Sequence, residues 1–252
     1  EVVQRQAVRA LGRLERPALV GDIQPMLSSP FASVRTAAAE ALGQAASALG
    51  ADVSGLVQTV LLQHLGGERD HAVIGAVCRT LGRLPYATAQ AARSAEVALL
   101  TVALAFDAPS GAGLTLRLGV ARGFESLLRR NARSFTPSAE TVRRMKELAL
   151  ARLTPRRGEE PEDLDRVRRL ALAALAPPKQ ADETTLIAAA GDPDGQVRRL
   201  ALVAMAAAPP ALVREAARTV LIRTALADPD ALVRYEALRI HARSLVGAFA
   251  DW

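Results

Sequence analysis

Aromatic residues make up only 3% of this 252-residue chain, and cysteine, histidine and lysine are also scarce. Half of the residues are hydrophobic, so the core has to be built mainly from alanine, leucine and valine, which favour helices in close contact. The single cysteine, Cys78, excludes an internal disulfide. Lys146 and Lys179 are the only lysines, so arginine supplies nearly all the positive charge behind the net +6. In so alanine-rich a chain this bias reflects genome composition more than recognition.

Signatures of catalysis are missing as well. The three histidines, His64, His71 and His241, form no His-x-x-His or His-Glu pair. His71 and Cys78 are seven residues apart and would supply only two ligands, too few for a zinc site. The sequence contains no Gly-x-Ser-x-Gly elbow and no phosphate-binding Gly-Lys loop. We therefore expect no enzyme activity, no metal and no cofactor in this segment, although an adjacent catalytic domain outside it is compatible with the sequence.

Long apolar runs are absent too. The longest, about residues 97–106 and 200–213, are too short to span a bilayer or are interrupted by Pro209 and Pro210. We expect no membrane span. The first residue is Glu1 rather than methionine, which is compatible with removal of a targeting segment. The expected compartment is the cytoplasm, or the periplasm if a signal peptide was cleaved.

What the chain does contain is a recurring pattern. Residues 192–201 read Asp-Pro-Asp-Gly-Gln-Val-Arg-Arg-Leu-Ala, and residues 228–237 read Asp-Pro-Asp-Ala-Leu-Val-Arg-Tyr-Glu-Ala. Proline does not fit inside a helix, whereas Asp194 and Asp230 can accept hydrogen bonds from the free N–H groups of a helix that starts there. Apolar residues then recur at helical spacing after the valine. The pattern predicts a turn followed by one helix of a two-helix hairpin.

Seven copies of this pattern run through the chain, each anchored on a valine or leucine. The anchors lie 30 to 51 residues apart, a range typical of helical-hairpin solenoids. The Gly- and Pro-rich stretches 107–113 and 154–161 are predicted to be surface loops inside one solenoid that covers residues 1–252. The anchors are Val3, Val34, Val73, Leu116, Val167, Val197 and Val233, and the partner helices are expected near 17–28, 52–66, 88–105, 138–153, 181–191 and 210–227.

The full pattern, Asp-Pro-Asp-x-x-Val-Arg-x-x-Ala-x-x-Ala-Leu-Gly-x-Leu, resembles the HEAT repeat in its short bacterial form, also called HEAT-like or phycobilisome-lyase-like. The resemblance implies an all-α fold, an armadillo-type α-α superhelix of about seven helical hairpins. It also implies that the anchored second helices line the concave side. Because both ends of the chain lack a partner helix or a polar cap, we expect a segment of a larger bacterial protein, truncated at both ends.

Arginines occupy two sets of positions relative to the anchors. Those one residue after the anchor are predicted to pair with aspartates such as Asp192 and Asp228 at neighbouring turns, an arrangement that HEAT proteins are known for. Those two and six residues after it share one helical stripe, and would form a basic strip along the concave wall. The first set is Arg35, Arg117, Arg168, Arg198 and Arg234; the candidate partner-binding residues of the strip are Arg5, Arg9, Arg79, Arg122, Arg169, Arg199, Tyr235 and Arg239.

Three functions are compatible with these features. The leading hypothesis is a protein-interaction scaffold that binds an acidic protein or peptide on its concave face. The second is nucleic-acid binding through the arginine strip, which salt would weaken steeply. The third, from the resemblance alone, is an accessory region of an enzyme such as a peptidyl-prolyl isomerase or a bilin lyase.

Overall fold

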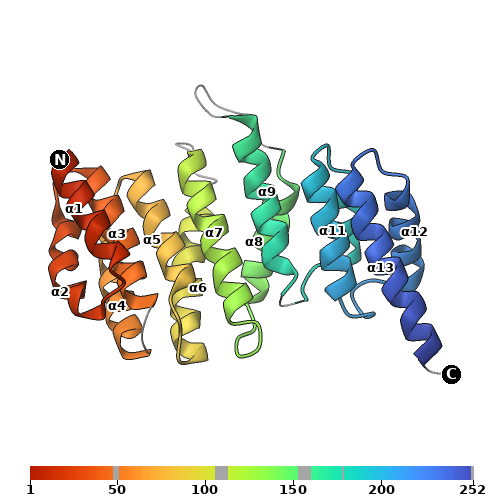
Figure 1. Ribbon diagram of the computed structural model, residues 1–252, viewed down its shortest axis with the longest axis horizontal. Helices are drawn as coiled ribbons and strands as arrows, with labels where there is room; N and C mark the ends of the chain where they lie inside the picture. Colours follow the sequence, from red (N-terminus) through yellow and green to blue (C-terminus); the bar gives the residue numbers. More distant parts are fainter. Residues whose placement is uncertain (48–50, 106–112, 153–159, 178, 251–252) are drawn as a thin grey trace. The chain divides into compact units, whose positions relative to one another are not determined.

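The computed structural model describes residues 1–47, 51–105, 113–152, 160–177 and 179–250. Within these ranges all regular structure is helical, so the predicted all-α class is confirmed (Figure 1). The stretches 107–113 and 154–161, which we predicted to be surface loops, lie almost entirely outside the described residues.

Each anchor of the repeated pattern lies in one of the odd-numbered helices. In α3, α5, α7, α11 and α13 the anchor is the third residue of the helix. The odd-numbered helices are α1 (Val2–Arg13), α3 (Ala32–Ser47), α5 (His71–Arg83), α7 (Leu114–Arg130), α9 (Pro161–Leu175), α11 (Gly195–Ala207) and α13 (Ala231–Ala250).

The even-numbered helices are the partners. The first predicted partner, residues 17–28, is not one helix, because two 3₁₀ turns, η1 (Pro17–Leu19) and η2 (Gln24–Ser28), flank the short α2. Pro25 has no N–H to donate, which explains the end of α2 at Ile23. The last partner begins at Glu215 rather than at 210, after the turn set by Pro209 and Pro210. The bounds are α2 (Val20–Ile23), α4 (Ala51–Gly67), α6 (Ala89–Leu104), α8 (Ala139–Leu150), α10 (Glu183–Ala190) and α12 (Glu215–Leu226).

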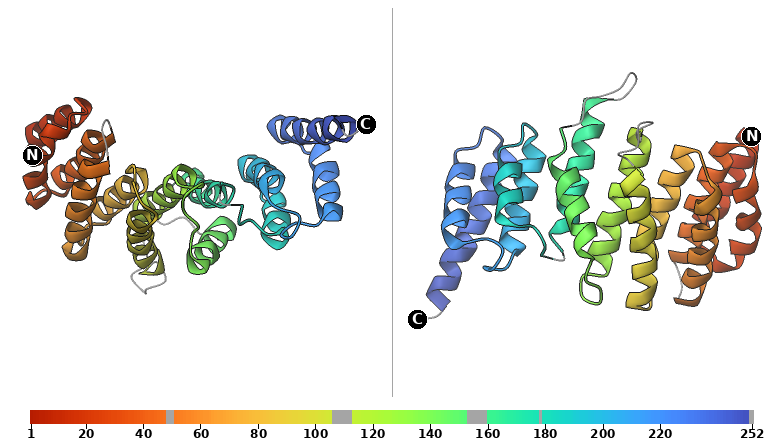
Figure 2. Two further views of the ribbon diagram at one scale, coloured as in Figure 1. Left: turned by 90° about the horizontal axis from the view of Figure 1, so that it is seen from below. Right: turned by 180° about the vertical axis from the view of Figure 1, so that it is seen from behind.

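The contacts divide the chain into two compact units, residues 1–144 and residues 145–252. In the first unit α1, α3, α5 and α7 pack one on the next as a layer, and α4 and α6 pack against that layer (Figures 1 and 2). In the second unit α9, α11 and α13 form the layer, and α10 and α12 pack against it. The core between the layers consists mainly of alanine, leucine and valine, as the composition predicted.

Aspartates at the turns start several of these helices. The Asp70 carboxylate accepts hydrogen bonds from the N–H groups of Ala72 and Val73, at 2.9 and 3.2 Å. Asp194 and Asp230 do the same at α11 and α13, where each accepts an N–H two residues later, at 3.1 and 2.8 Å. These bonds satisfy N–H groups that have no partner inside the helix, so the predicted capping role of both aspartates is confirmed.

The glycine of the repeated pattern has a packing role. Gly12, Gly43 and Gly82 each lie nine residues after their anchor, where the next odd-numbered helix approaches closely. A methyl group on Gly43 would lie 2.5 Å from the Thr80 side chain, and one on Gly82 would lie 2.0 Å from the carbonyl oxygen of Gly123. The odd-numbered helices therefore approach closely at these glycines, against side-chain atoms at Gly43 and against backbone atoms at Gly82.

Candidate functional site

The arginine that follows the anchor ties its helix to the preceding turn. Nη1 of Arg198 donates to the carbonyl oxygens of Asp192 and Pro193, at 2.8 and 3.0 Å. Nη1 of Arg234 donates to those of Asp228 and Pro229, at 2.7 and 2.9 Å. Arg35 repeats the arrangement with the carbonyl oxygens of residues 29 and 30. One edge of the guanidinium group is thus engaged in the same way in three repeats.

The other edge of the guanidinium group reaches the turn before the next odd-numbered helix. Nε and Nη2 of Arg198 both donate to Asp228, at 2.7 Å each. Arg168 donates to Asp192 at 3.1 Å, and both side chains are almost fully buried. The predicted pairing with turn aspartates is confirmed for these two arginines. Such two-pronged bonds between repeats hold the helices in register.

Arg35 follows the same rule with a different acid. Its Nε and Nη2 donate to Glu68, at 2.7 and 3.0 Å, so a glutamate stands where an aspartate was expected. Glu68 lies five residues before its anchor Val73, as Asp192 and Asp228 do before theirs. That shared spacing is the signal by which the sequence would have identified Glu68.

Glu68 makes stability dependent on pH. Burial acts to raise the pKa of Glu68, but hydrogen bonds from Arg35 and from the N–H groups of Asp70 and Arg69 outweigh it and lower the pKa to about 2, from 4.5. Because the folded pKa lies below the unfolded value, the ionised carboxylate stabilises the fold above about pH 5, and this contribution is lost as the pH falls toward 2.

We expect Glu68→Gln to make the free energy of unfolding depend less on pH below about pH 5. Between pH 7 and pH 3 the wild type should lose about 2 kcal/mol more free energy of unfolding than the variant, since only the wild type has this carboxyl to protonate. Urea unfolding followed by circular dichroism at several pH values measures both curves. Parallel curves would show that Glu68 keeps an ordinary pKa in the folded protein.

In the first unit, only some residues of the predicted arginine strip are exposed and without an acidic partner among the described residues. Arg79 pairs with Glu40 of the neighbouring helix α3, and Glu40 occupies a strip position itself. Arg5 is partly buried, and its Nε atom has no hydrogen-bond partner, whereas Arg9 is exposed. Arg122 lies partly buried on α7. The strip of this unit therefore mixes paired and unpaired charge.

The second unit gathers three of the candidate residues around one carboxylate. Glu236, which is 5% exposed, accepts a hydrogen bond from Nε of Arg239 at 3.1 Å and lies 4.0 Å from Nη1 of Arg199. Tyr235 lies four residues before Arg239 on the same helix, and its side chain is 65% exposed. We call Arg199, Tyr235 and Arg239 the Arg–Tyr patch. One buried acid thus lies near two arginines, and the exposed Tyr235 is its neighbour in the sequence.

The fourth candidate in this unit, Arg169, pairs with Asp194 at the start of α11 through Nη2, at 3.0 Å. Burial acts to raise the pKa of Asp194, but hydrogen bonds from Arg169 and from the N–H of Gln196 outweigh it and lower the pKa below its usual value. The pair is therefore ionised at neutral pH. Asp194 also caps α11, so Arg169 is engaged in holding α9 to α11.

Acidic, histidine and cysteine side chains are possible metal ligands or nucleophiles. In the part of the chain that the structure describes, no three acidic, histidine or cysteine side chains are grouped so that they could hold a metal ion. Cys78 is buried in α5, and burial raises the pKa of its thiol to about 12, which disfavours the reactive thiolate. Among the same residues, no helix has both the length and the apolar surface required to cross a bilayer.

A family model described as HEAT repeats matches residues 1–58, which contain α1, α2, α3 and part of α4. No curated protein matches the chain. The resemblance drawn from the repeated pattern is thus supported by an independent match over the first two anchored helices.

Proposed function

We propose that this chain, a HEAT-repeat protein, is an interaction scaffold that binds an acidic protein or peptide through the Arg–Tyr patch. HEAT repeats are in general protein-interaction scaffolds, and the family is typically non-catalytic. The bacterial origin, the larger protein and the accessory role beside an enzyme stay predictions from the resemblance.

The exposure of Tyr235 is the observation that carries this proposal. A tyrosine that is 65% exposed is unusual in a chain with so few aromatics, and Arg239 follows it by four residues on α13. Arg239 and Arg199 both lie near the carboxylate of Glu236, the residue next to Tyr235. Tyrosine and arginine are the residues most enriched in the energetic centres of protein interfaces. Before a partner arrives, Arg239 is held by a hydrogen bond to Glu236 and Arg199 by one to Gln196, which lowers the entropic cost of binding.

The charges of the patch favour a carboxylate-bearing partner over nucleic acid. Two guanidinium groups share one carboxylate in the patch, so one positive charge remains for an acidic side chain. Elsewhere on the strip, Arg79 and Arg169 are already paired with Glu40 and Asp194. A phosphate backbone would need several free arginines in a row, which these pairs interrupt.

Site-specific photo-crosslinking tests the proposal. A photoreactive phenylalanine analogue at position 235 should give discrete protein adducts in an extract of the source organism. Position 220 on α12 is the matched control, because Val220 is 62% exposed but belongs to the other layer. The adducts should disappear when Arg199 and Arg239 are both changed to glutamine. Equal adducts at both positions, or duplex DNA retained on a filter at low salt, would contradict the proposal.

A further inference from the structure

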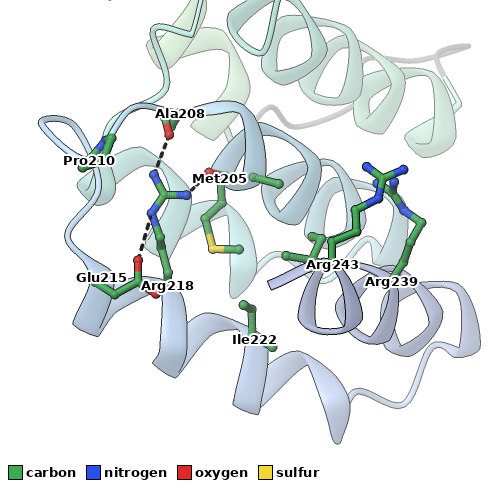
Figure 3. Close-up of a pocket in the computed structure, with 10 residues that line it drawn as sticks. Met205, Ala208, Pro210, Glu215, Arg218, Ile222, Arg239 and Arg243 are labelled. Carbon is green, nitrogen blue, oxygen red and sulfur yellow. Dashed lines mark hydrogen bonds and ion pairs between the residues drawn. The ribbon is translucent and has the colours of Figure 1, made fainter. Parts of the chain in front are cut away.

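A cavity of about 460 Å³ opens in the second unit, where the end of α11 meets α12 and α13 (Figure 3). Its apolar wall contains Met205, Ile222 and Ile240. Its charged groups are Glu215, Arg218, Arg239 and Arg243, and Ala206, Ala208 and Pro210 complete the lining. The cavity therefore combines an apolar wall with an excess of positive charge.

Arg218 on one side of the cavity has a structural role. Its Nη1 donates to the carbonyl oxygen of Met205 at 2.6 Å, and its Nη2 donates to that of Ala208 at 2.5 Å. These bonds reach carbonyl groups at the end of α11, where that of Met205 also accepts a hydrogen bond from the N–H of Ala208. Arg218 thus joins α12 to α11 and leaves Arg239 and Arg243 as the arginines that a ligand can use.

Arg243 has no structural role within the part of the chain that the structure describes. It is exposed, and no hydrogen bond or ion pair to another described residue involves it, whereas Arg239 is held by Glu236. The two arginines lie four residues apart on α13, and both line the cavity (Figure 3). Like charges at this spacing repel each other, so an anion between them would relieve the repulsion and gain charge-assisted hydrogen bonds.

The cavity is continuous with the Arg–Tyr patch. Tyr235, Arg239 and Arg243 are spaced by four residues along α13 and so follow one side of the helix. Arg239 belongs to both the patch and the cavity lining. A peptide bound at Tyr235 can therefore extend along α13 toward Met205 and Ile222.

We propose that this cavity binds a peptide segment in which a carboxylate adjoins a bulky apolar side chain. The carboxylate pairs with Arg243 and Arg239, and the apolar side chain packs on Met205, Ile222 and Ile240. This inference rests on the proposed function and deepens it, because it names the chemistry of the segment that the scaffold recognises. The carboxylate belongs to an aspartate or glutamate side chain or to the C-terminus of the partner.

Fluorescence anisotropy with three labelled peptides tests the cavity. The first, Gly-Ser-Gly-Glu-Phe-Gly-amide, carries a side-chain carboxylate. The second, Gly-Ser-Gly-Gln-Ser-Phe, carries a free C-terminus, and the third, Gly-Ser-Gly-Gln-Phe-Gly-amide, carries no carboxylate. We expect at least one of the first two to bind saturably to the full chain, and about tenfold more tightly than the third. Which of the two binds identifies the source of the carboxylate.

The matched variants are Arg243→Gln and Arg223→Gln. Both residues are exposed arginines on neighbouring helices, but only Arg243 lines the cavity. Arg243→Gln should weaken binding of the preferred peptide about tenfold, as loss of one charge-assisted contact implies, and Arg223→Gln should leave it unchanged. Ile222→Ala should also weaken it, because it removes part of the apolar wall. Equal binding of all three peptides, or equal effects of the two arginine variants, would overturn the proposal.

The two proposals can fail separately. Tyr235 is part of the Arg–Tyr patch but does not line the cavity, so the two sites can be tested independently. If crosslinking at position 235 succeeds while no carboxylate peptide binds, only the cavity proposal is wrong. If a carboxylate peptide binds the cavity while position 235 gives no specific adduct, the Arg–Tyr patch is not the partner site.

Discussion

Gly82→Ala should lower the free energy of unfolding of the first unit by about 3 kcal/mol, toward the upper end of overpacking effects. The added methyl group would lie 2.0 Å from the carbonyl oxygen and 2.5 Å from the Cα atom of Gly123. Both are backbone atoms of α7, so no side-chain rotation can relieve the clash and α5 has to move away from α7. The loss outweighs the gain of roughly 1 kcal/mol that alanine brings to a helix.

The lone cysteine provides the measurement. Cys78 is buried in α5, so its reaction with an aromatic disulfide reagent reports the opening of that helix. We expect Gly82→Ala to accelerate labelling about a hundredfold under native conditions, in proportion to the open population. Gly55→Ala is the control, because a methyl group there meets nothing within 4 Å and α4 should gain stability. Equal labelling rates in the two variants would show that α5 and α7 tolerate a wider spacing.

Asp192→Ala should cost the second unit about 3 kcal/mol, as expected when one partner of a buried ion pair is removed. Asp192 is 3% exposed and accepts hydrogen bonds from Arg168 at 3.1 Å, from Arg152 at 2.8 Å and from the N–H of Asp194 at 2.9 Å. Without it the buried Arg168 guanidinium keeps, among the described residues, the ion pair with Asp165 at 2.9 Å. Because this pair with Asp165 remains, the expected loss in free energy of unfolding lies at the lower end of the range for broken buried ion pairs.

Urea unfolding followed by circular dichroism measures this loss, with Glu215→Ala as the control. Glu215 is 88% exposed and lies 3.8 Å from Arg218, so its removal should change stability by less than about 0.5 kcal/mol. Adding Arg168→Met to Asp192→Ala should restore much of the stability, because it removes the unpaired charge. A double variant no more stable than Asp192→Ala would mean that the cost lies in the turn and not in Arg168.

The predicted arginine strip shows which features of a candidate site can be predicted from the sequence and which cannot. The spacing placed Arg79, Arg169, Arg199 and Arg239 on the odd-numbered helices, and the structure shows each of them near an acid. The partners lie far off in sequence in three cases, since Glu40, Asp194 and Glu236 are 39, 25 and 37 residues from Arg79, Arg169 and Arg199. Helical periodicity gives the face of a residue but not the residue opposite it on the next helix.

The sequence by itself determined the local structure. The helical class and the helix starts at Asp194 and Asp230 follow from turn chemistry and helical spacing within one repeat. The pairing of Arg168 and Arg198 with turn aspartates was expected from the resemblance to HEAT repeats and from the tendency of charges near a packed seam to pair. Only the tertiary structure decided how closely α5 and α7 approach at Gly82, which carboxylate Arg199 and Arg239 share, and that a cavity opens beside Arg243. These features depend on the spacing and relative rotation of whole helices, which result from the packing of all their contacting side chains together.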